Sequence, residues 1–326
     1  MNCGQNPSNP ICIHHHDLLI QDKQTLLGLI KSCRTHQDLP KARSIHSQMM
    51  RICSFLDDLH INNALLSMYA RCGAFEEAKK VFDELPRRDV LAWNVLISCY
   101  AKLKRYNEAL IFYKLMKDEG ISPDSFTFVC ILKVCSTMGL IEMGEEIHAD
   151  VKKINCNLVK ENIVLATALV NMYAKCGALE KAQEVFRQIP VRNVVTWTSL
   201  IAGYVQHGFG DQALQCFKNM KDEGVSPNAI TFSCILRACT LEGAPELGEV
   251  IEVEIRKRGL LQKDTVLGAT LVDMYVKCGL LPKAREVFDK LPNRNIVSWC
   301  TLIAGYAEDG NGEEALLCFN QMQMCG

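Results

Sequence analysis

The sequence predicts an all-α protein built as a solenoid of helical hairpins. Three segments, 67–97, 171–201 and 273–303, align without gaps at offsets of 104 and 102 residues. These offsets are too long for one helical hairpin and fit three. A hairpin of about 35 residues cannot bury its apolar stripe alone, so neighbouring hairpins must bury it for one another.

Equivalent positions divide the chain into nine repeats, numbered here from one to nine. Each contains two stretches with apolar residues at three- and four-residue spacing, which predicts two amphipathic helices. The repeats are 23–58, 59–89, 90–124, 125–162, 163–193, 194–228, 229–264, 265–295 and 296–326, and the ninth stops inside its pattern. Residues 1–22 are expected to form a flexible N-terminal segment.

Glycine and proline mark the ends of the predicted helices. Glycine at the end of a first helix fills a left-handed position at little cost, and proline after a second helix prevents its continuation. The glycines are Gly73, Gly177 and Gly279, and the prolines are Pro86, Pro190 and Pro292.

Tryptophan recurs at one position of the first helix. These residues are interpreted as core packing rather than base stacking: Trp93, Trp197 and Trp299.

Composition excludes several classes of protein. With 48% hydrophobic and 22% charged residues, the chain can bury a large core. The net charge of −1 argues against bulk electrostatic binding of nucleic acid. Seventeen cysteines without a Cys-x-x-Cys pair fit a reducing compartment. No run reaches the length of a membrane helix, and the first 22 residues, which lack Lys and Arg, do not resemble an Arg-rich transit peptide.

Several motifs resemble the pentatricopeptide repeat family, in particular its plant organelle class with alternating long, short and standard repeats. The short repeats carry MYAKCG-like segments at 68–82, 172–186 and 274–288. The standard repeats carry W-x-x-LI and end in segments such as 120–124, and the long repeats carry LKVC at 132–135 and EEIH at 145–148. The resemblance covers residue 23 to the end. It implies a right-handed superhelix that binds single-stranded RNA, one base per repeat.

In that family the fifth and last residues of a repeat read one base together. Here the resemblance implies uridine for Asn63 with Asp89 and for Asn94 with Asp124, and adenosine for Thr167 with Asn193 and for Thr198 with Asn228. The implied core is 5′-UU-N-AA-3′. The pairs that are harder to interpret are Leu27 with Asp58, Val129 with Asn162, Ser233 with Asp264, Ala269 with Asn295, and Cys300, for which the sequence contains no last residue.

Two further positions are implied by the resemblance. The second residue of a repeat would press on the base plane, although a core position is an equal alternative: Leu91, Phe126, Val164, Val195, Ile230, Val266 and Val297. The thirteenth residue would contact phosphate, or else favour the helix dipole as a solvated cation: Arg71, Lys102, Lys175 and Lys277. Gln206 and Glu308 interrupt this series.

Catalytic and metal-binding constellations are not expected, and no cofactor is predicted. His46 and His148 are replaced by Glu252 in the third long repeat, which argues against a built site. The recurrent cysteines of the first helices are too far apart along a solenoid to share a metal and are interpreted as buried hydrophobes: Cys33, Cys72, Cys135, Cys176, Cys239 and Cys278. Cys12 with His14, His15 and His16 is assigned to the flexible tail. We therefore expect no enzymatic activity.

The resemblance implies the RNA-reading part of a specificity factor for cytidine-to-uridine editing in an organelle, with the mitochondrion favoured over the chloroplast. A deaminase or other editing factor would then act in trans, and neither DNA nor a membrane would be a partner. An RNA processing or stability factor without an editing role is one alternative. A tetratricopeptide-type protein-binding scaffold is another, although a scaffold would have no evident reason to place Asn or Thr at position five and Asp or Asn at the exit of a repeat.

Overall fold

A computed structural model describes residues 23–51 and 58–325, and all regular structure in these ranges is helical. The candidate tail ligands Cys12 and His14 to His16 lie outside the described residues. The helices belong to two compact units, Met1–Ser122 and Pro123–Gly326, and each unit is described by itself.

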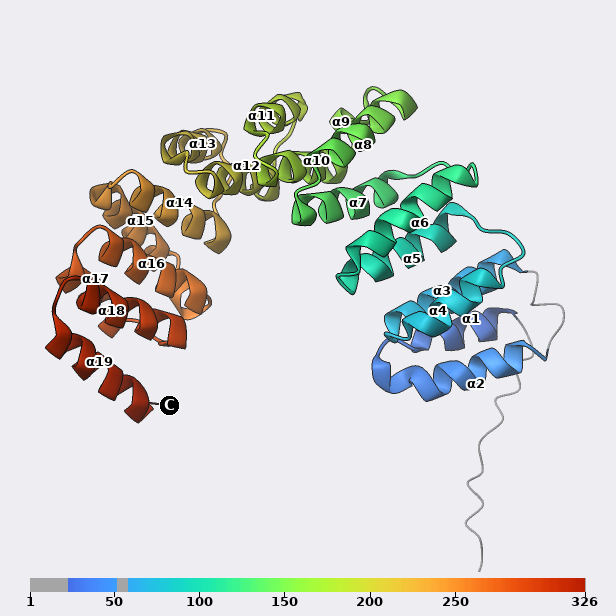
Figure 1. Cartoon of the computed structure of the whole chain (residues 1–326), viewed down its shortest axis with the longest axis horizontal. Helices are drawn as coiled ribbons and strands as arrows, with labels where there is room; N and C mark the ends of the chain where they lie inside the picture. The colour runs from blue at the N-terminus through green and yellow to red at the C-terminus, as the bar shows by residue number, and fades with distance from the viewer. Residues whose placement is uncertain (1–22, 52–57, 326) are drawn as a thin grey trace, which may run out of the picture. The chain divides into compact units, whose positions relative to one another are not determined.

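The first compact unit holds repeats one to three. Its helices, drawn in blue to teal in Figure 1, are α1 (Lys23–Ser32), η1 (His36–Asp38), α2 (Leu39–Met49), α3 (Leu59–Arg71), α4 (Phe75–Asp83), α5 (Val90–Lys102) and α6 (Tyr106–Asp118).

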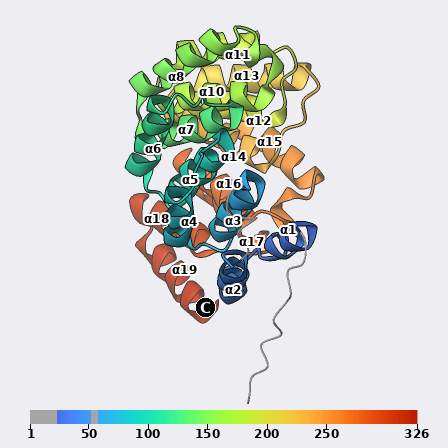
Figure 2. The ribbon, with the colours of Figure 1, turned by 90° about the vertical axis from the view of Figure 1, so that its right-hand side faces the viewer.

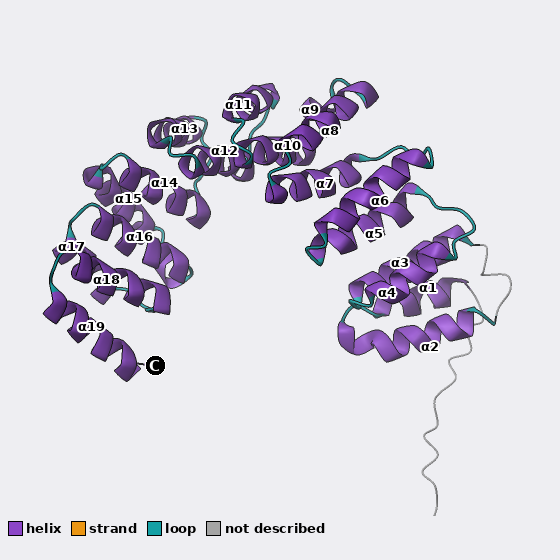
Figure 3. Ribbon diagram, viewed as in Figure 1, coloured by secondary structure: helices purple, strands orange, loops and turns teal. Residues whose placement is uncertain are grey.

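The second compact unit holds repeats four to nine, and all its described elements are again helices (Figure 3). They are α7 (Ser125–Met138), α8 (Ile141–Ile154), α9 (Leu158–Glu161), α10 (Ile163–Lys175), α11 (Leu179–Gln188), α12 (Val194–Gln206), α13 (Gly210–Asp222), α14 (Ala229–Leu241), α15 (Pro245–Lys257), η3 (Leu260–Gln262), α16 (Thr265–Lys277), α17 (Leu281–Asp289), α18 (Ile296–Glu308) and α19 (Gly312–Cys325).

Each repeat contributes one long helix to each of two layers. We call the first of each repeat the A helix (α1, α3, α5, α7, α10, α12, α14, α16 and α18) and the second the B helix (α2, α4, α6, α8, α11, α13, α15, α17 and α19). Neighbouring A helices pack on one another, with α3 between α1 and α5 in the first unit and α7, α10, α12, α14, α16 and α18 in succession in the second. Figures 1 and 2 both show α11 and α13 farther out than α10 and α12. Each unit is therefore an α-solenoid, as the repeat pattern predicts.

The predicted role of glycine at the ends of the A helices is confirmed. Gly73, Gly177 and Gly279 have φ values of +72°, +84° and +73°, the left-handed region in which a side chain is unfavourable. Each directly follows the C-cap residue of an A helix, so it turns the chain toward the B helix.

The recurrent tryptophans are core residues, as predicted. Trp93, Trp197 and Trp299 are 1%, 3% and 5% exposed. Each packs edge-on against a phenylalanine of the preceding B helix, with ring centroids 4.8, 4.6 and 4.5 Å apart. These phenylalanines are Phe82, Phe186 and Phe288, and an arginine covers each of their outer faces. This recurring cluster joins one repeat to the next.

The recurrent cysteines are packed into the helical layers as small hydrophobes. Cys33, Cys72, Cys135 and Cys239 are completely buried, whereas Cys176 and Cys278 are half-buried. Burial raises the pKa of Cys135 and of Cys239 to about 12, so both thiols stay protonated and unreactive. Among the described residues, no cluster of His, Cys, Asp or Glu could hold a metal, and no helix is long and apolar enough to span a bilayer.

Candidate nucleic-acid interface

The last residue of every repeat from one to eight is the N-cap of the next A helix. Each side chain accepts at least one backbone N–H from the first turn of that helix: Asp58, Asp89, Asp124, Asn162, Asn193, Asn228, Asp264 and Asn295. Asp and Asn are among the strongest N-capping residues because their oxygens satisfy otherwise unpaired amides. The expectation that a scaffold has no reason for Asp or Asn here is therefore wrong, since capping favours them in any such solenoid.

The pair formed by Asn63 and Asp89 is joined directly. Asn63 Nδ2 donates to Asp89 Oδ2 at 2.8 Å, and the other carboxylate oxygen accepts the amide of Ala92 at 2.9 Å. Asn63 is only 4% exposed, and its Oδ1 has no hydrogen-bond partner among the described residues. The pair is thus pre-oriented, with one buried acceptor unsatisfied.

The two adenosine-type pairs are joined through an intervening threonine. Thr167 Oγ1 lies 2.8 Å from Thr196 Oγ1, which donates to Asn193 Oδ1 at 3.1 Å. In the next repeat Thr198 Oγ1 lies 2.8 Å from the hydroxyl of Thr231, which donates to Asn228 Oδ1 at 3.0 Å. Thr167 is half-buried and Thr198 is 8% exposed. The same geometry in consecutive repeats indicates one recurring arrangement of polar groups.

Thr196 and Thr231 are functional candidates that the sequence reading missed. Both are fully buried and both hydrogen-bond to the exit residue three positions earlier. The signal was available, because Ser or Thr three residues after Asp or Asn at a helix start is typical of a reciprocal cap.

Asn94 and Asp124 belong to different compact units. Asn94 is 4% exposed on α5. Asp124 caps α7, where its Oδ1 accepts the amide of Thr127 at 2.8 Å and the hydroxyl of the same residue at 2.9 Å. The other fifth-position residues range from buried to exposed: Leu27, Val129 and Ser233 are half-buried, Ala269 is 4% exposed and Cys300 is exposed.

The second-position residues form a row of exposed apolar side chains. All seven are between 49% and 64% exposed: Leu91, Phe126, Val164, Val195, Ile230, Val266 and Val297. The alternative that placed them in the core is therefore wrong. Each lies in the first turn of an A helix, three residues before a fifth-position side chain, so the two share a face of that helix.

In repeat eight these positions meet around one cavity. The cavity has a volume of about 290 Å³ and is lined by Val266, Val297, Ala269, Asn295, Arg237, Asp273, Thr270 and Thr301. It contains second-position side chains from two neighbouring A helices, a fifth residue and an exit residue. The structure thus brings the sequence-predicted positions of this repeat into one open pocket.

The four thirteenth-position cations differ in their surroundings. Arg71 donates through Nε to the carbonyl of Cys33 and through Nη2 to that of Ile30, at 3.3 and 3.1 Å. Arg71 therefore holds the end of α1. This structural role differs from both expected roles, which were contact with phosphate and a solvated cation that favours the helix dipole. Lys277 pairs with Asp273 at 2.9 Å, whereas the exposed ammonium groups of Lys102 and Lys175 have no partner among the described residues.

His46 and His148 each contact a tyrosine of the neighbouring repeat. His46 and His148 each place Nδ1 2.9 Å from the hydroxyl of a tyrosine on the next A helix, Tyr69 and Tyr173 respectively. In the third long repeat Glu252 accepts the hydroxyl of Tyr275 at 2.6 Å. Burial lowers the pKa of His46 and brings that of His148 to about 4. His and Glu are thus interchangeable partners for one buried phenol.

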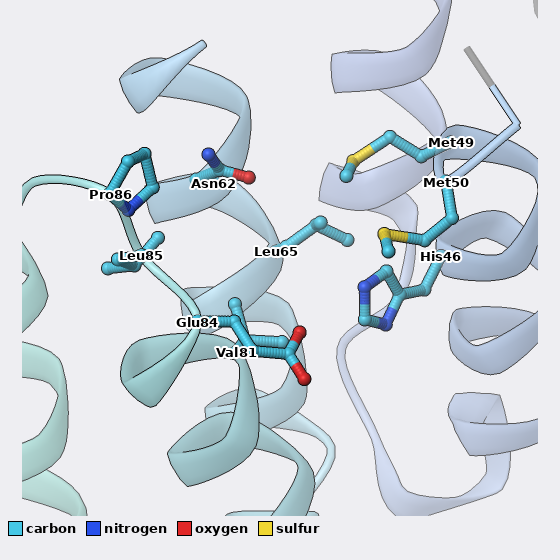
Figure 4. A pocket seen from close by; sticks show the side chains of 9 residues that line it. All are labelled: His46, Met49, Met50, Asn62, Leu65, Val81, Glu84, Leu85 and Pro86. Atoms are coloured by element: carbon cyan, nitrogen blue, oxygen red, sulfur yellow. The ribbon is translucent and has the colours of Figure 1, made fainter. Parts of the chain in front are cut away.

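Each histidine borders an open cavity between helices. The pocket beside His46 has a volume of about 210 Å³ and includes Met49, Met50, Leu65 and Glu84 in its wall (Figure 4). The pocket beside His148 measures about 250 Å³ and is lined by Glu145, Lys152, Lys181 and Glu184. The two pockets thus differ in their lining, and in the third long repeat Glu252 stands where the other two have histidine.

Charge is segregated between the two helical layers. Acidic residues are almost absent from the A helices, which contain only Asp273 and Glu308, against the cations Lys23, Lys31, Arg71, Lys102, Lys133, Lys175, Arg237 and Lys277. Carboxylates are more frequent on the B helices, with four on each of α8 and α15, although α2 carries none. Cations of the B helices are widely paired across repeats, as in Lys181 with Glu145 at 2.5 Å and Lys221 with Glu254 at 3.0 Å. The near-zero net charge therefore conceals an excess of cations within the A helices, which the capping carboxylates Asp58, Asp89, Asp124 and Asp264 offset in part.

Comparison with known proteins agrees with this architecture. Models described as PPR repeat and PPR repeat family match residues 63–90, 88–137, 164–194, 192–240, 270–296 and 297–326. A chloroplastic pentatricopeptide repeat-containing protein of Arabidopsis thaliana is 33% identical over 93% of this chain and 48% of its own length. A putative mitochondrial one from the same plant is 34% identical over 91% of this chain and 46% of its own length. The chain thus spans about half the length of these relatives.

Solved structures show the same fold. The crystal structure of the pentatricopeptide repeat protein PPR10 in complex with an 18-nt psaJ RNA element has a TM-score of 0.80 at 19% identity, covering 94% of this chain and 45% of that one. The structure of PPR10 from maize has a TM-score of 0.56 at 20% identity, covering 98% of this chain and 57% of that one. On these matches and on its repeat architecture, the chain belongs to the pentatricopeptide repeat family.

Proposed function

We propose that this chain binds single-stranded RNA along its A helices. Each repeat whose fifth and last residues form an interpretable pair would recognise one base. The observation that carries this proposal is the excess of cations within the A helices, on which hydrogen-bonded polar pairs recur beside exposed apolar side chains. Phosphates favour these cations, apolar side chains can stack on base planes, and polar pairs can present donors and acceptors to base edges. A protein-binding scaffold accounts for the exit residues through capping but not for this combination.

The base assignment rests on the family code. Asn63 with Asp89 and Asn94 with Asp124 correspond to uridine, and Thr167 with Asn193 and Thr198 with Asn228 to adenosine, which gives UU-N-AA. Two observations support a fixed reading geometry. Asn63 is held by its own exit residue, and both threonines are held by equivalent hydrogen-bond chains. Because Asn63 and Thr198 are nearly buried, a base must reach them between neighbouring A helices.

The biological setting is proposed from the relatives. Their names place them in chloroplasts and mitochondria, so we assign this chain to an organelle, with the mitochondrion as the first choice. The long, short and standard order of its repeats suggests an editing specificity factor of the plant organelle class that positions a deaminase supplied in trans. An RNA processing or stability factor would use the same RNA-binding surface without a deaminase.

The first experiment compares the affinity of the protein for two RNA oligomers by fluorescence anisotropy. One oligomer contains UU-C-AA, and the other contains the same nucleotides in scrambled order. We expect tighter binding to the first, because the paired polar groups are pre-oriented. Equal and weak binding to both would favour the protein-binding scaffold.

The register is tested by Asn94→Thr. With Asp124 unchanged, the family code moves the preference at that base from U toward G, by about 1 to 3 kcal/mol on the scale of a single base contact. Affinities for four oligomers that differ only at that base measure the change. An unaltered preference would contradict the assigned register.

A further inference from the structure

The long repeats carry a cation that the thirteenth-position series does not include. Their thirteenth residues are Thr35, Thr137 and Leu241, so the series is interrupted at every long repeat, in addition to the interruptions at Gln206 and Glu308. The ninth residue of each long repeat is instead a cation, Lys31, Lys133 or Arg237. In the short and standard repeats the ninth residue is Ser67, Ser98, Asn171, Ala202, Asp273 or Ala304.

Helix geometry places these cations on the same face as the reading positions. Positions five, nine and thirteen are separated by four residues each, so their side chains lie along one side of an A helix. Lys31, Lys133 and Arg237 are all exposed. Within the described part of the chain, none of the three side chains makes an ion pair or a hydrogen bond, whereas the B-helix cations Lys181 and Lys221 are bound to carboxylates.

Arg237 shows where such a cation lies relative to the reading positions. It lines the cavity of repeat eight together with Val266, Val297, Ala269 and Asn295. It also lines a second cavity of about 130 Å³ with Val205, Thr240, Leu241, Asp273 and the thirteenth-position cation Lys277. Arg237 therefore lies between a base-reading position and a cation that the family places near phosphate.

We propose that Arg237 and Lys133, and by repeat equivalence Lys31, bind the RNA phosphate backbone at the long repeats, where position thirteen provides no cation. This inference rests on the proposed RNA-binding function and extends it. A guanidinium or ammonium that lacks a carboxylate partner can pair with a phosphate without first breaking an ion pair. The long repeats, which read bases poorly, would then hold the strand between the reading repeats.

Salt dependence provides the test. Affinities of the unaltered protein and of Lys133→Gln, Arg237→Gln and the double variant are measured between 50 and 200 mM salt, for the UU-C-AA oligomer and for polyuridylate. Each lost contact to a single strand should reduce the slope of log affinity against log salt by about 0.7. The double variant should show about twice that reduction, with the ratio of affinities for the two RNAs unchanged.

Two further variants provide matched controls. Lys218→Gln removes an exposed cation from the B helix α13 and should leave the slope unchanged. Asp273→Asn removes the carboxylate that lines both cavities with Arg237, so binding of both RNAs should become tighter. Circular dichroism checks whether each substitution leaves the helices intact.

The outcomes separate the inference from the function on which it rests. Absence of RNA binding by the unaltered protein overturns both. Normal binding by the unaltered protein, with wild-type slopes in the double variant, overturns the phosphate assignment alone. A changed base preference in Arg237→Gln without a change of slope also overturns it, because Arg237 would then contact a base.

Discussion

Asn63 and Asp89 share one hydrogen bond, 2.8 Å from Nδ2 to Oδ2, while the second oxygen of the same carboxylate caps α5. One side chain thus begins a helix and orients the polar group proposed to read a base. Because the two tasks use different oxygens, substitutions at Asp89 can separate them.

We predict that Asp89→Asn keeps the fold stable and alters base preference, whereas Asp89→Ala destabilises the protein. Asn caps the A helix at the equivalent position of repeat five, so the cap survives the first change while the acceptor for Asn63 is replaced by an amide. Alanine removes the cap, at a cost of about 1 kcal/mol, and leaves the buried amide of Asn63 without its acceptor, which raises the total to about 2 to 4 kcal/mol. Thermal unfolding and binding to oligomers varied at one base measure the two effects.

The two Asp89 variants can contradict the assignment independently. If Asp89→Asn unfolds as readily as Asp89→Ala, the carboxylate has a structural role beyond capping. If Asp89→Asn retains the wild-type base preference, Asp89 is a cap alone.

We predict that Val195→Ser weakens RNA binding without lowering stability. Val195 is 55% exposed in the first turn of α12, and substitutions at such surface positions change stability by about 0.5 kcal/mol or less. An apolar side chain lost from a base plane should nevertheless reduce affinity, by about tenfold on the scale of one stacking contact. Anisotropy titration and thermal unfolding are compared for the same preparation.

The matched control for Val195 is Val250→Ser, on the B helix α15. Val250 is 63% exposed and has the same side chain, but it lies in the layer of B helices. Equal losses of affinity in the two variants would show that exposure alone, rather than position on the A layer, determines the effect.

The ends of the first helices and the core tryptophans were predictable from the sequence, because residues equivalent to Gly177 and Trp197 recur in every triplet. The exposure of Val195 could not be predicted. An apolar residue in the first turn of a helix can face a neighbouring helix or the solvent, and the spacing of apolar residues in the sequence is the same in both cases. The contacts of Arg71 with α1 were also hidden, because its partners are backbone carbonyls 38 and 41 residues away. Side-chain identity predicts layers well here, and it predicts contacts between repeats poorly.

We predict that His148 makes the protein less stable in acid. Burial, with a contribution from Lys152, lowers the pKa of His148 to about 4, whereas an unfolded histidine titrates near about 6.5. Between these values the unfolded chain binds a proton that the folded chain does not, so the free energy of unfolding falls as pH falls, by at most about 1.4 kcal/mol per pH unit. The contribution is complete above about pH 6.5 and is lost as pH approaches 4.

The measurement for His148 is the melting temperature of the wild type and of His148→Gln at several values of pH between 4 and 7. The variant should show a shallower decline in acid, because its amide does not titrate in this range. Parallel curves for the two proteins would mean that another group controls the acid sensitivity.

We predict that Gly203→Ala destabilises the array although alanine favours helices. A Cβ at position 203 would lie 2.5 Å from Cβ of Ala174 and 3.2 Å from its Cα, so α10 and α12 would have to separate. The gain in helix propensity is about 1 kcal/mol, and overpacking costs about 1 to 3 kcal/mol, so the clash should dominate.

The control for Gly203→Ala is Gly28→Ala, where no atom lies within 4 Å of the new Cβ. The gain in helix propensity should there appear as a higher melting temperature. An increase for Gly203→Ala as well would show that neighbouring A helices can move apart at little cost, and the spacing proposed to admit a base between them would then not be fixed by the fold.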